Sequence, residues 1–144
     1  MYETILIPTD GSEISSTAAK EGIDLADTTG TVHVLSVIEE LPMYKQSGKG
    51  AKLDENDQSA ARASLTEATD RIEELADSAD VDCTTTITEG VPHREITSYA
   101  DEIDADAIVM GKRGQRAAAG DILGSTTERV IKHASSKVLT VPES

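Results

Sequence analysis

The chain has 144 residues, of which 27 are acidic and 13 basic, and its formal net charge is −14 with a pI near 4.4. This length fits a single domain over residues 1–144 with a hydrophobic core of its own. The acidic balance excludes a general nucleic-acid surface and an anionic membrane as partners, because the mean electrostatic field would repel both. An anionic ligand must therefore bind at a local site.

The composition resembles that of proteins adapted to high intracellular salt. There is no Phe or Trp, whereas Ala, Thr, Asp and Glu are plentiful. We treat a halophilic origin as a hypothesis, and the alternative is an ordinary acidic protein. Measurements of unfolding at low salt separate the two.

Cysteine and histidine are too sparse to build a metal centre. Cys83 is the single cysteine, which excludes an intramolecular disulfide and a cysteine-rich zinc cluster. His33, His93 and His133 lack metal-ligand spacing, and we expect structural or surface roles for them. The start of the chain is too short and acidic for a signal peptide, and no apolar run approaches transmembrane length. We therefore expect a cytoplasmic protein without a membrane partner.

Strand-like runs alternate with helical patterns along the chain. Five such runs cover residues 2–8, 31–38, 81–88, 106–110 and 137–141. This alternation predicts parallel βαβ units with right-handed crossovers, because adjacent parallel strands need a helical connection. The expected fold is an α/β, open, doubly wound, five-stranded parallel sheet with helices on both faces.

Four helices are expected between these strands. The first begins at residue 12 or 13, ends at residue 27 and buries Ile14, Ala18, Leu25 and Ala26. The second has apolar residues three and four apart, namely Ala61, Leu65, Ala68, Ile72, Leu75 and Ala79. The third begins near Pro92 and buries Ile96, Tyr99, Ala100 and Ile103. The polar stretch 39–57 is read as a loop, and its Gly48-Lys49-Gly50 lacks the context of a P-loop.

The fourth helix is expected after a glycine motif with an unusual concentration of basic residues. Gly111 and Gly114 follow a strand-like run and can aim several backbone N–H groups at one anion. Ser125 follows Gly124 and forms an S-x-x-E capping box with Glu128, which predicts a helix start with free amides. Basic residues within the motif are Lys112, Arg113 and Arg116. These features predict a phosphate site, and the alternative is a glycine-rich loop before an ordinary capped helix.

A second polar turn, residues 8–12, follows the first strand. Ligands of doubly wound sheets bind at the carboxyl ends of strands where the strand order reverses, so two turns lining one crevice require the order 3-2-1-4-5. Asp10 suits a hydrated Mg²⁺ or Mn²⁺ beside a triphosphate, and Thr9 offers a hydroxyl or an amide to the same ligand. Alternatively, Asp10 caps the first helix, since its spacing to Glu13 is that of a capping box.

An adenine pocket without Phe or Trp needs aliphatic walls. Val37, near the end of the second strand, is a candidate for such a wall, and ordinary strand core is the alternative. No Ser/His/Asp order, no Cys/His pair and no second acidic residue beside Asp10 indicates a catalytic centre, so any hydrolysis is expected to be slow. A receiver domain is disfavoured, because the third strand ends at Thr88-Glu89 without a phosphoacceptor Asp.

These segments together resemble the universal stress protein family over nearly the whole chain. Residues 5–12 resemble its first strand and turn, Gly90-Val91-Pro92 the start of its third helix, and residues 138–142 its last strand. Residues 106–114 with Gly124-Ser125 match the family signature G-x2-G-x9-G-[ST] without a gap.

The resemblance implies an adenine-nucleotide α-hydrolase-like fold that binds ATP with Mg²⁺ or Mn²⁺, the metal at Asp10. The implied nucleotide-binding residues are Pro8, Thr9, Asp10, Val37, Met110, Gly111, Arg113, Gly114, Gly124, Ser125 and Thr126. It also implies a homodimer through the last strand, at Val138, Leu139, Thr140 and Val141. The expected function is that of a cytosolic, nucleotide-responsive regulator in the stress response. The alternative is a slow ATPase or nucleotide-transfer enzyme of the same fold.

Overall fold

The computed structural model describes residues 2–11, 13–39, 55–112 and 123–142. Strands and helices alternate along these segments as the sequence predicts. In chain order they are β1 (Tyr2–Pro8), α1 (Glu13–Leu25), β2 (Ala26–Glu39), α3 (Glu55–Ser78), β3 (Asp82–Gly90), α4 (Pro92–Glu102), β4 (Ala107–Gly111), α5 (Ser125–His133) and β5 (Lys137–Val141).

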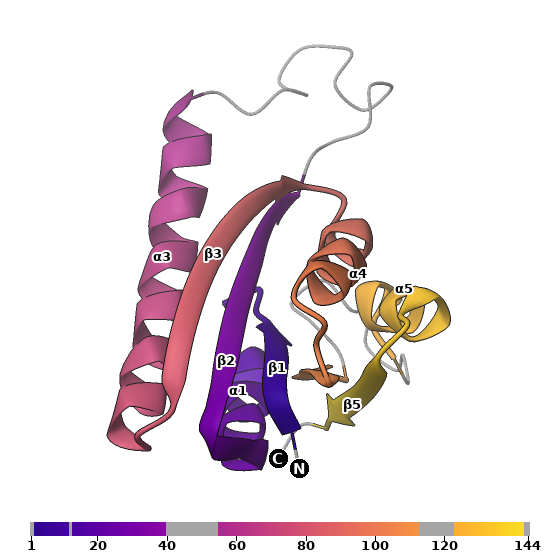
Figure 1. Cartoon of the computed structure of the whole chain (residues 1–144). Coiled ribbons are helices and arrows are strands. Elements are labelled where there is room, and N and C mark those ends of the chain that lie inside the picture. Colours follow the sequence, from indigo (N-terminus) through magenta and orange to yellow (C-terminus); the bar gives the residue numbers. More distant parts are fainter. Residues whose placement is uncertain (1, 12, 40–54, 113–122, 143–144) are drawn as a thin grey trace.

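The strands form one parallel sheet of five strands with the order β3-β2-β1-β4-β5 (Figure 1). This confirms the order inferred from the positions of the two polar turns. Ile5 of β1 aligns with Val32 of β2 on one side and with Ala107 of β4 on the other. Because β1 and β4 are neighbours, the turns that follow them meet at the same edge of the sheet.

Each face of the sheet is covered by two helices, which bury separate clusters of apolar residues. On one face α1 and α3 pack over a cluster of Ile5, Ile7, Ala18, Ala19, Ile23, Val32, Val34, Ile72, Ala76, Val81, Val109 and Val141. On the other face α4 and α5 pack over Leu6, Leu35, Ile96, Ala100, Ile108, Met110 and Val130. Successive residues of β1 alternate between the clusters, as the two-residue period of a strand requires.

The boundary between α1 and β2 differs from the prediction. The helix ends at Leu25 and β2 begins at Ala26, whereas the sequence suggested a helix to residue 27 and a strand from residue 31. Tyr2 pairs with Ala26 and Thr4 with Thr31, so an irregularity between these pairs absorbs the additional strand residues. Ala18 is buried as expected, Leu25 and Ala26 lie half-buried against the core, and the side chain of Ile14 is outside the described part.

The buried stripe of α3 also departs from the prediction near its end. Ala68 and Ile72 are buried as expected, but Ala76 continues the stripe, Leu75 is 37% exposed, and Ala79 lies beyond the helix. The four-residue steps from Ala68 to Ile72 and Ala76 place these three side chains on the face of α3 that packs against the sheet. In α4, Ile96 and Ala100 are buried, with the other two predicted core residues packed beside them. Within the described segments, none of the helices has the length and apolar character needed to cross a bilayer.

Candidate functional site

The turn after β1 is held against β2 by hydrogen bonds from both sides of Thr9. The Thr9 N–H donates to the carbonyl oxygen of Leu35 over 2.9 Å, and the hydroxyl of Ser36, which is 0% exposed, donates to the carbonyl oxygen of Thr9 over 3.1 Å. Gly11 has a φ of +84°, a conformation that suits glycine, and its N–H reaches the Thr9 hydroxyl oxygen over 3.2 Å. The turn is therefore fixed, and it presents the exposed Asp10 at the sheet edge.

The two halves of the glycine motif are joined at their base. The N–H of Gly124 donates to the carbonyl oxygen of Lys112 over 2.9 Å, and the hydroxyl of Thr127 donates to the carbonyl oxygen of Gly111 over 2.9 Å. Lys112 N–H in turn donates to the carbonyl oxygen of Val141 over 2.8 Å. These bonds hold the start of α5 next to the end of β4. Of the predicted ligands in this motif, Arg113 and Gly114 lie outside the described residues.

The start of α5 is not the predicted capping box. Gly124 occupies the N-cap position with φ −68° and ψ 154°, no side chain caps the helix, and Ser125 is the first helical residue. The prediction placed Ser125 one position too early, because a glycine can adopt the extended N-cap backbone as well as a serine can. Since the first N–H groups of a helix have no intrahelical acceptor, the amides of Ser125 and Thr126 stay available for an anion. Ser125 is exposed and Thr126 is half-buried.

Val37, the predicted adenine-side residue, lies against the same hydrophobic cluster as Met110, another of the predicted nucleotide-binding residues. Met110 is 6% exposed and belongs to the cluster beneath α4 and α5, and Val37 is half-buried against the same cluster. Pro8, at the end of β1, is buried and aligns with Leu35. An aliphatic wall therefore continues from the β1 turn toward the end of β2.

The predicted metal ligand, Asp10, lies within the described structure. Within the described segments no three His, Cys, Asp or Glu side chains converge to hold a metal ion. An exposed carboxylate at Asp10, next to the predicted anion site, suits Mg²⁺ or Mn²⁺, because such ions usually take one or two carboxylates and complete their shell with phosphate oxygens and water.

Comparison with known proteins decides the family. The sequence model of the universal stress protein family matches residues 1–142. This chain belongs to the universal stress protein family. Universal stress protein MJ0531 of Methanocaldococcus jannaschii is 35% identical over 142 residues, which cover 98% of this chain and 82% of that protein. Universal stress protein MJ0577 of the same organism is 30% identical over 155 aligned positions, which cover 98% of this chain and 95% of that protein.

Solved structures share the fold of this universal stress protein over its full length. The structure of MJ0577 superposes with a TM-score of 0.80 at 30% identity and covers 100% of this chain and 98% of that one. A universal stress protein crystallised in complex with cAMP superposes with a TM-score of 0.70 at 26% identity, covering 99% of this chain and 98% of that one.

The sequence analysis missed two buried hydroxyls that fix the turns of this universal stress protein. Ser36 lies in an otherwise apolar strand, and Thr127 lies in the first turn of α5, where it is 3% exposed. Ser36 could have been predicted, because it is a polar residue inside the apolar run 34–38. Thr127 could not, because a threonine near the start of a helix is ordinary in any protein.

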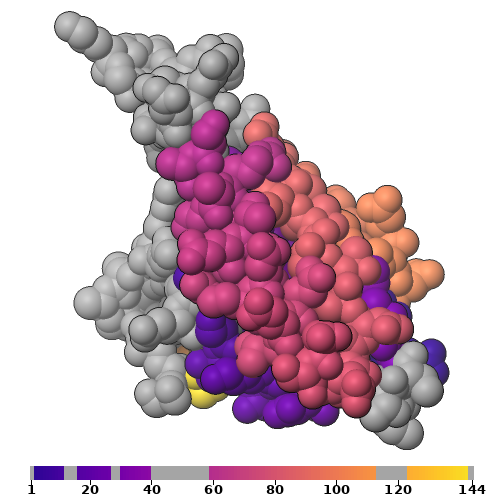
Figure 2. Space-filling view, turned by 90° about the vertical axis from the view of Figure 1, so that its left-hand side faces the viewer, coloured from indigo at the N-terminus to yellow at the C-terminus, as the bar shows by residue number. Residues whose placement is uncertain are grey.

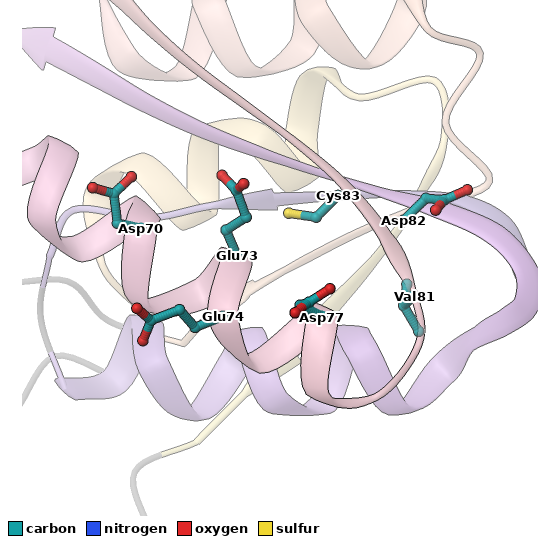
Figure 3. A pocket seen from close by; sticks show the side chains of 7 residues that line it. All are labelled: Asp70, Glu73, Glu74, Asp77, Val81, Asp82 and Cys83. Carbon is teal, nitrogen blue, oxygen red and sulfur yellow. The ribbon is translucent and has the colours of Figure 1, made fainter.

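A surface pocket of about 540 Å³ lies elsewhere, between the last turns of α3 and the first residues of β3 (Figure 3). Its lining is acidic and consists of Asp70, Glu73, Glu74, Asp77, Val81, Asp82 and Cys83. Burial and the neighbouring Glu73 carboxylate raise the pKa of the Cys83 thiol to about 11. Negative lining at the start of a strand, opposite the predicted ligand edge, excludes this pocket as the phosphate site.

Proposed function

We propose that this universal stress protein binds an adenine nucleotide, ATP with Mg²⁺ or Mn²⁺, between the β1 turn and the β4 loop. In this proposal it acts in the cytoplasm as a nucleotide-responsive regulator in the stress response. The observation that carries the proposal is the pair of fixed turns at adjacent strand ends, one of which opens an uncapped helix. The relative crystallised with cAMP supports an adenine nucleotide as the ligand class.

Each part of the nucleotide has a counterpart in this arrangement. The phosphates would accept hydrogen bonds from the amides of Gly111 and of the first turn of α5, with Arg113 and Gly114 completing the family signature. The adenine would lie against Val37 and Met110. When bound, the metal ion supplies positive charge between the phosphates and the Asp10 carboxylate.

Binding is favoured over rapid catalysis as the primary activity. The β1 turn, residues 8–12, contains one acidic residue, Asp10, and no histidine, so this turn by itself supplies no acid–base pair for catalysis. The alternative function, a slow ATPase or nucleotide-transfer enzyme, predicts multiple-turnover phosphate release from the purified protein. A regulator predicts at most one turnover per site during the same experiment.

Two measurements test nucleotide binding. Denaturing the purified protein should release an adenine nucleotide, and calorimetric titration of nucleotide-free protein with Mg-ATP should be saturable. Gly114→Val should abolish that binding in a folded protein, because a bulky side chain would stand where phosphate approaches the backbone. Asp10→Ala should weaken Mg-ATP more than metal-free ATP. Equal losses with and without metal would show that Asp10 is only a cap of α1.

We also propose a homodimer through β5. This strand pairs only with β4 among the described strands, so its outer edge carries unpaired backbone groups. Of the predicted interface, Val138 and Val141 pack against the two cores, Thr140 is half-buried, and Leu139 is 42% exposed. Leu139→Lys should therefore produce a monomer in light scattering. A parent that is monomeric at micromolar concentration would contradict this interface.

A further inference from the structure

The first turn of α4 and the end of α5 bring basic side chains together. The rings of His93 and His133 lie with centroids 6.0 Å apart and planes inclined by 31°. Arg129 precedes His133 by one helical turn and shares its face of α5, and Arg94 follows His93. We call His93, Arg94, Arg129 and His133 the cationic cluster. His93 is half-buried and the other three residues are exposed.

Acidic residues stand next to both arginines in the sequence, Glu95 after Arg94 and Glu128 before Arg129. No ion pair within the described segments involves Arg94 or Arg129. By contrast, Lys132 of α5, the helix that carries Arg129, forms an ion pair with Glu128 over 3.0 Å. Two unpaired arginines beside two imidazoles are unexpected in a chain with 27 acidic and 13 basic residues.

The helix dipoles favour a positive charge at His133 but not at His93 and Arg94. His133 at the carboxyl end of α5 interacts favourably with the negative end of that helix. His93 and Arg94, however, lie in the first turn of α4, where a positive charge is unfavourable, and no side chain caps this end. The His93 amide is among the N–H groups that find no acceptor inside a helix. Basic side chains and a free amide at one helix end form the environment of an anion.

The charged groups that shift the pKa of His93 are all basic, although Glu95 lies in the same turn of α4. Partial burial lowers its pKa below the ordinary value of 6.5, and Arg129, Arg94 and His133 lower it further. Of these groups Arg94 lies on the same helix as His93, and Arg129 and His133 lie on α5. An anion bound among them would offset this potential and favour protonated His93.

We propose that the cationic cluster is a binding site for a small phosphate-type oxyanion, separate from the proposed nucleotide site. The guanidinium groups of Arg94 and Arg129 match the oxygens of a phosphate, and the imidazole N–H groups add donors. The ligand is small, because a net charge of −14 repels polyanions beyond the local cluster. Free phosphate and a small phosphate monoester share this chemistry and are compared in the test.

The three histidines of the chain make the proposal measurable. Nuclear magnetic resonance of the imidazole protons is recorded while inorganic phosphate or glycerol phosphate replaces chloride at constant ionic strength. We expect saturable shifts at His93 and His133 and none at His33, which contacts Tyr99 on the inner side of α4. The pKa of His93 should rise when phosphate is bound. Stronger binding of one probe identifies the free ion or the monoester as the better ligand.

Matched variants separate this site from general charge effects. Arg129→Gln should weaken phosphate binding at least tenfold, whereas Arg71→Gln, which removes an exposed arginine from α3, should leave it unchanged. Gly114→Val should also leave it unchanged, whether or not that loop binds ATP. Equal shifts of all three histidines, equal losses in both arginine variants, or loss of the response in Gly114→Val would overturn the proposal.

Discussion

The helices on the two faces of the sheet differ in how acidic they are: α4 and α5 together contain four acidic residues and three Lys or Arg residues. Helix α3, whose outward surface is seen in Figure 2, contains seven acidic and two basic residues. The side formed by α4 and α5 carries the cationic cluster. The α3 side therefore carries a larger share of the negative charge, and a small anion approaching α4 and α5 meets weaker repulsion. An acidic composition is therefore compatible with a local site for a small phosphate.

The largest expected effect concerns how closely the helices approach the sheet on the α1 and α3 side. A Cβ atom at Gly22 of α1 would lie 2.7 Å from Cδ1 and 2.9 Å from Cγ1 of Ile7, a fully buried residue. Gly22→Val should therefore destabilise the protein by about 3 kcal/mol in denaturant unfolding, because overpacking displaces the core.

Two variants of α1 serve as controls for this prediction. Gly22→Ala should cost less, since the better helix propensity of alanine, about 1 kcal/mol, offsets part of the clash. Lys20→Val, at an exposed position of the same helix, should change stability by less than about 0.5 kcal/mol. A Gly22→Val protein as stable as the parent would show that α1 moves away from the sheet at no cost.

The next largest effect concerns ATP binding, and it compares two buried threonines, Thr127 on one face of the sheet and Thr69 on the other. The Thr127 hydroxyl bonds across to Gly111 of the loop, whereas the Thr69 hydroxyl, on α3, donates to the Thr66 carbonyl oxygen of its own helix over 2.9 Å. Thr127→Val should weaken ATP binding about tenfold, or about 1.4 kcal/mol, because the loop base loses a bond that positions its amides. Calorimetric titration measures this loss.

Conservative replacements complete that test. Thr127→Ser keeps the hydroxyl and should bind ATP like the parent. Thr69→Val removes an equally buried hydroxyl, 2% exposed, and should leave ATP affinity unchanged even if stability falls. Equal affinity in Thr127→Val and the parent would leave Thr127 with a structural role alone.

The sequence predicted the sheet order because the two polar turns could serve one ligand only if β1 and β4 were neighbours. It could not predict how the turns are held. Ser36 and Thr127 act through bonds to the backbone of distant segments, and such bonds follow from register and not from spacing along the chain. Ser125 was misplaced for a related reason, since a glycine and a serine compete locally for one N-cap position. The His93–His133 pair arises from packing between helices that are separate in sequence.

A smaller effect comes from crowding of negative charge on α3. Asp70, Glu73, Glu74 and Asp77 lie three or four positions apart, so like charges face one another along the helix. Glu73→Gln should raise the free energy of unfolding at low salt by about 0.5 kcal/mol and reduce its increase with added KCl.

Two further readouts identify the source of that gain. Glu67→Gln removes an acid that lies 3.9 Å from Arg71 and should give no gain. Glu73→Gln should also speed alkylation of Cys83, because the pKa of about 11 falls when the neighbouring carboxylate is neutralised. A salt dependence that is the same in both variants would place the repulsion elsewhere on the chain.

The smallest expected effect is an acid sensitivity specific to the α4 and α5 side. Burial lowers the pKa of His33, whose Nδ1 lies 3.4 Å from the Tyr99 hydroxyl, and burial with nearby positive charges lowers the pKa of His93. Because these groups bind protons more weakly when folded, their contribution to stability is complete above pH 6.5 and is lost as the pH falls through the lowered values.

Asp106 contributes in a separate, lower range of pH. Its carboxylate accepts the N–H groups of Thr4 and Glu3, each over 2.9 Å, and these bonds lower its pKa below 3.8. Combining His33→Gln with His93→Gln should therefore flatten the loss of stability just below pH 6.5 while leaving the loss at lower pH unchanged. Thermal unfolding across this range measures both. An unchanged slope below pH 6.5 would assign that acid sensitivity to carboxylates, which both α3 on one face and α4 and α5 on the other contain, and would remove this difference between the two faces.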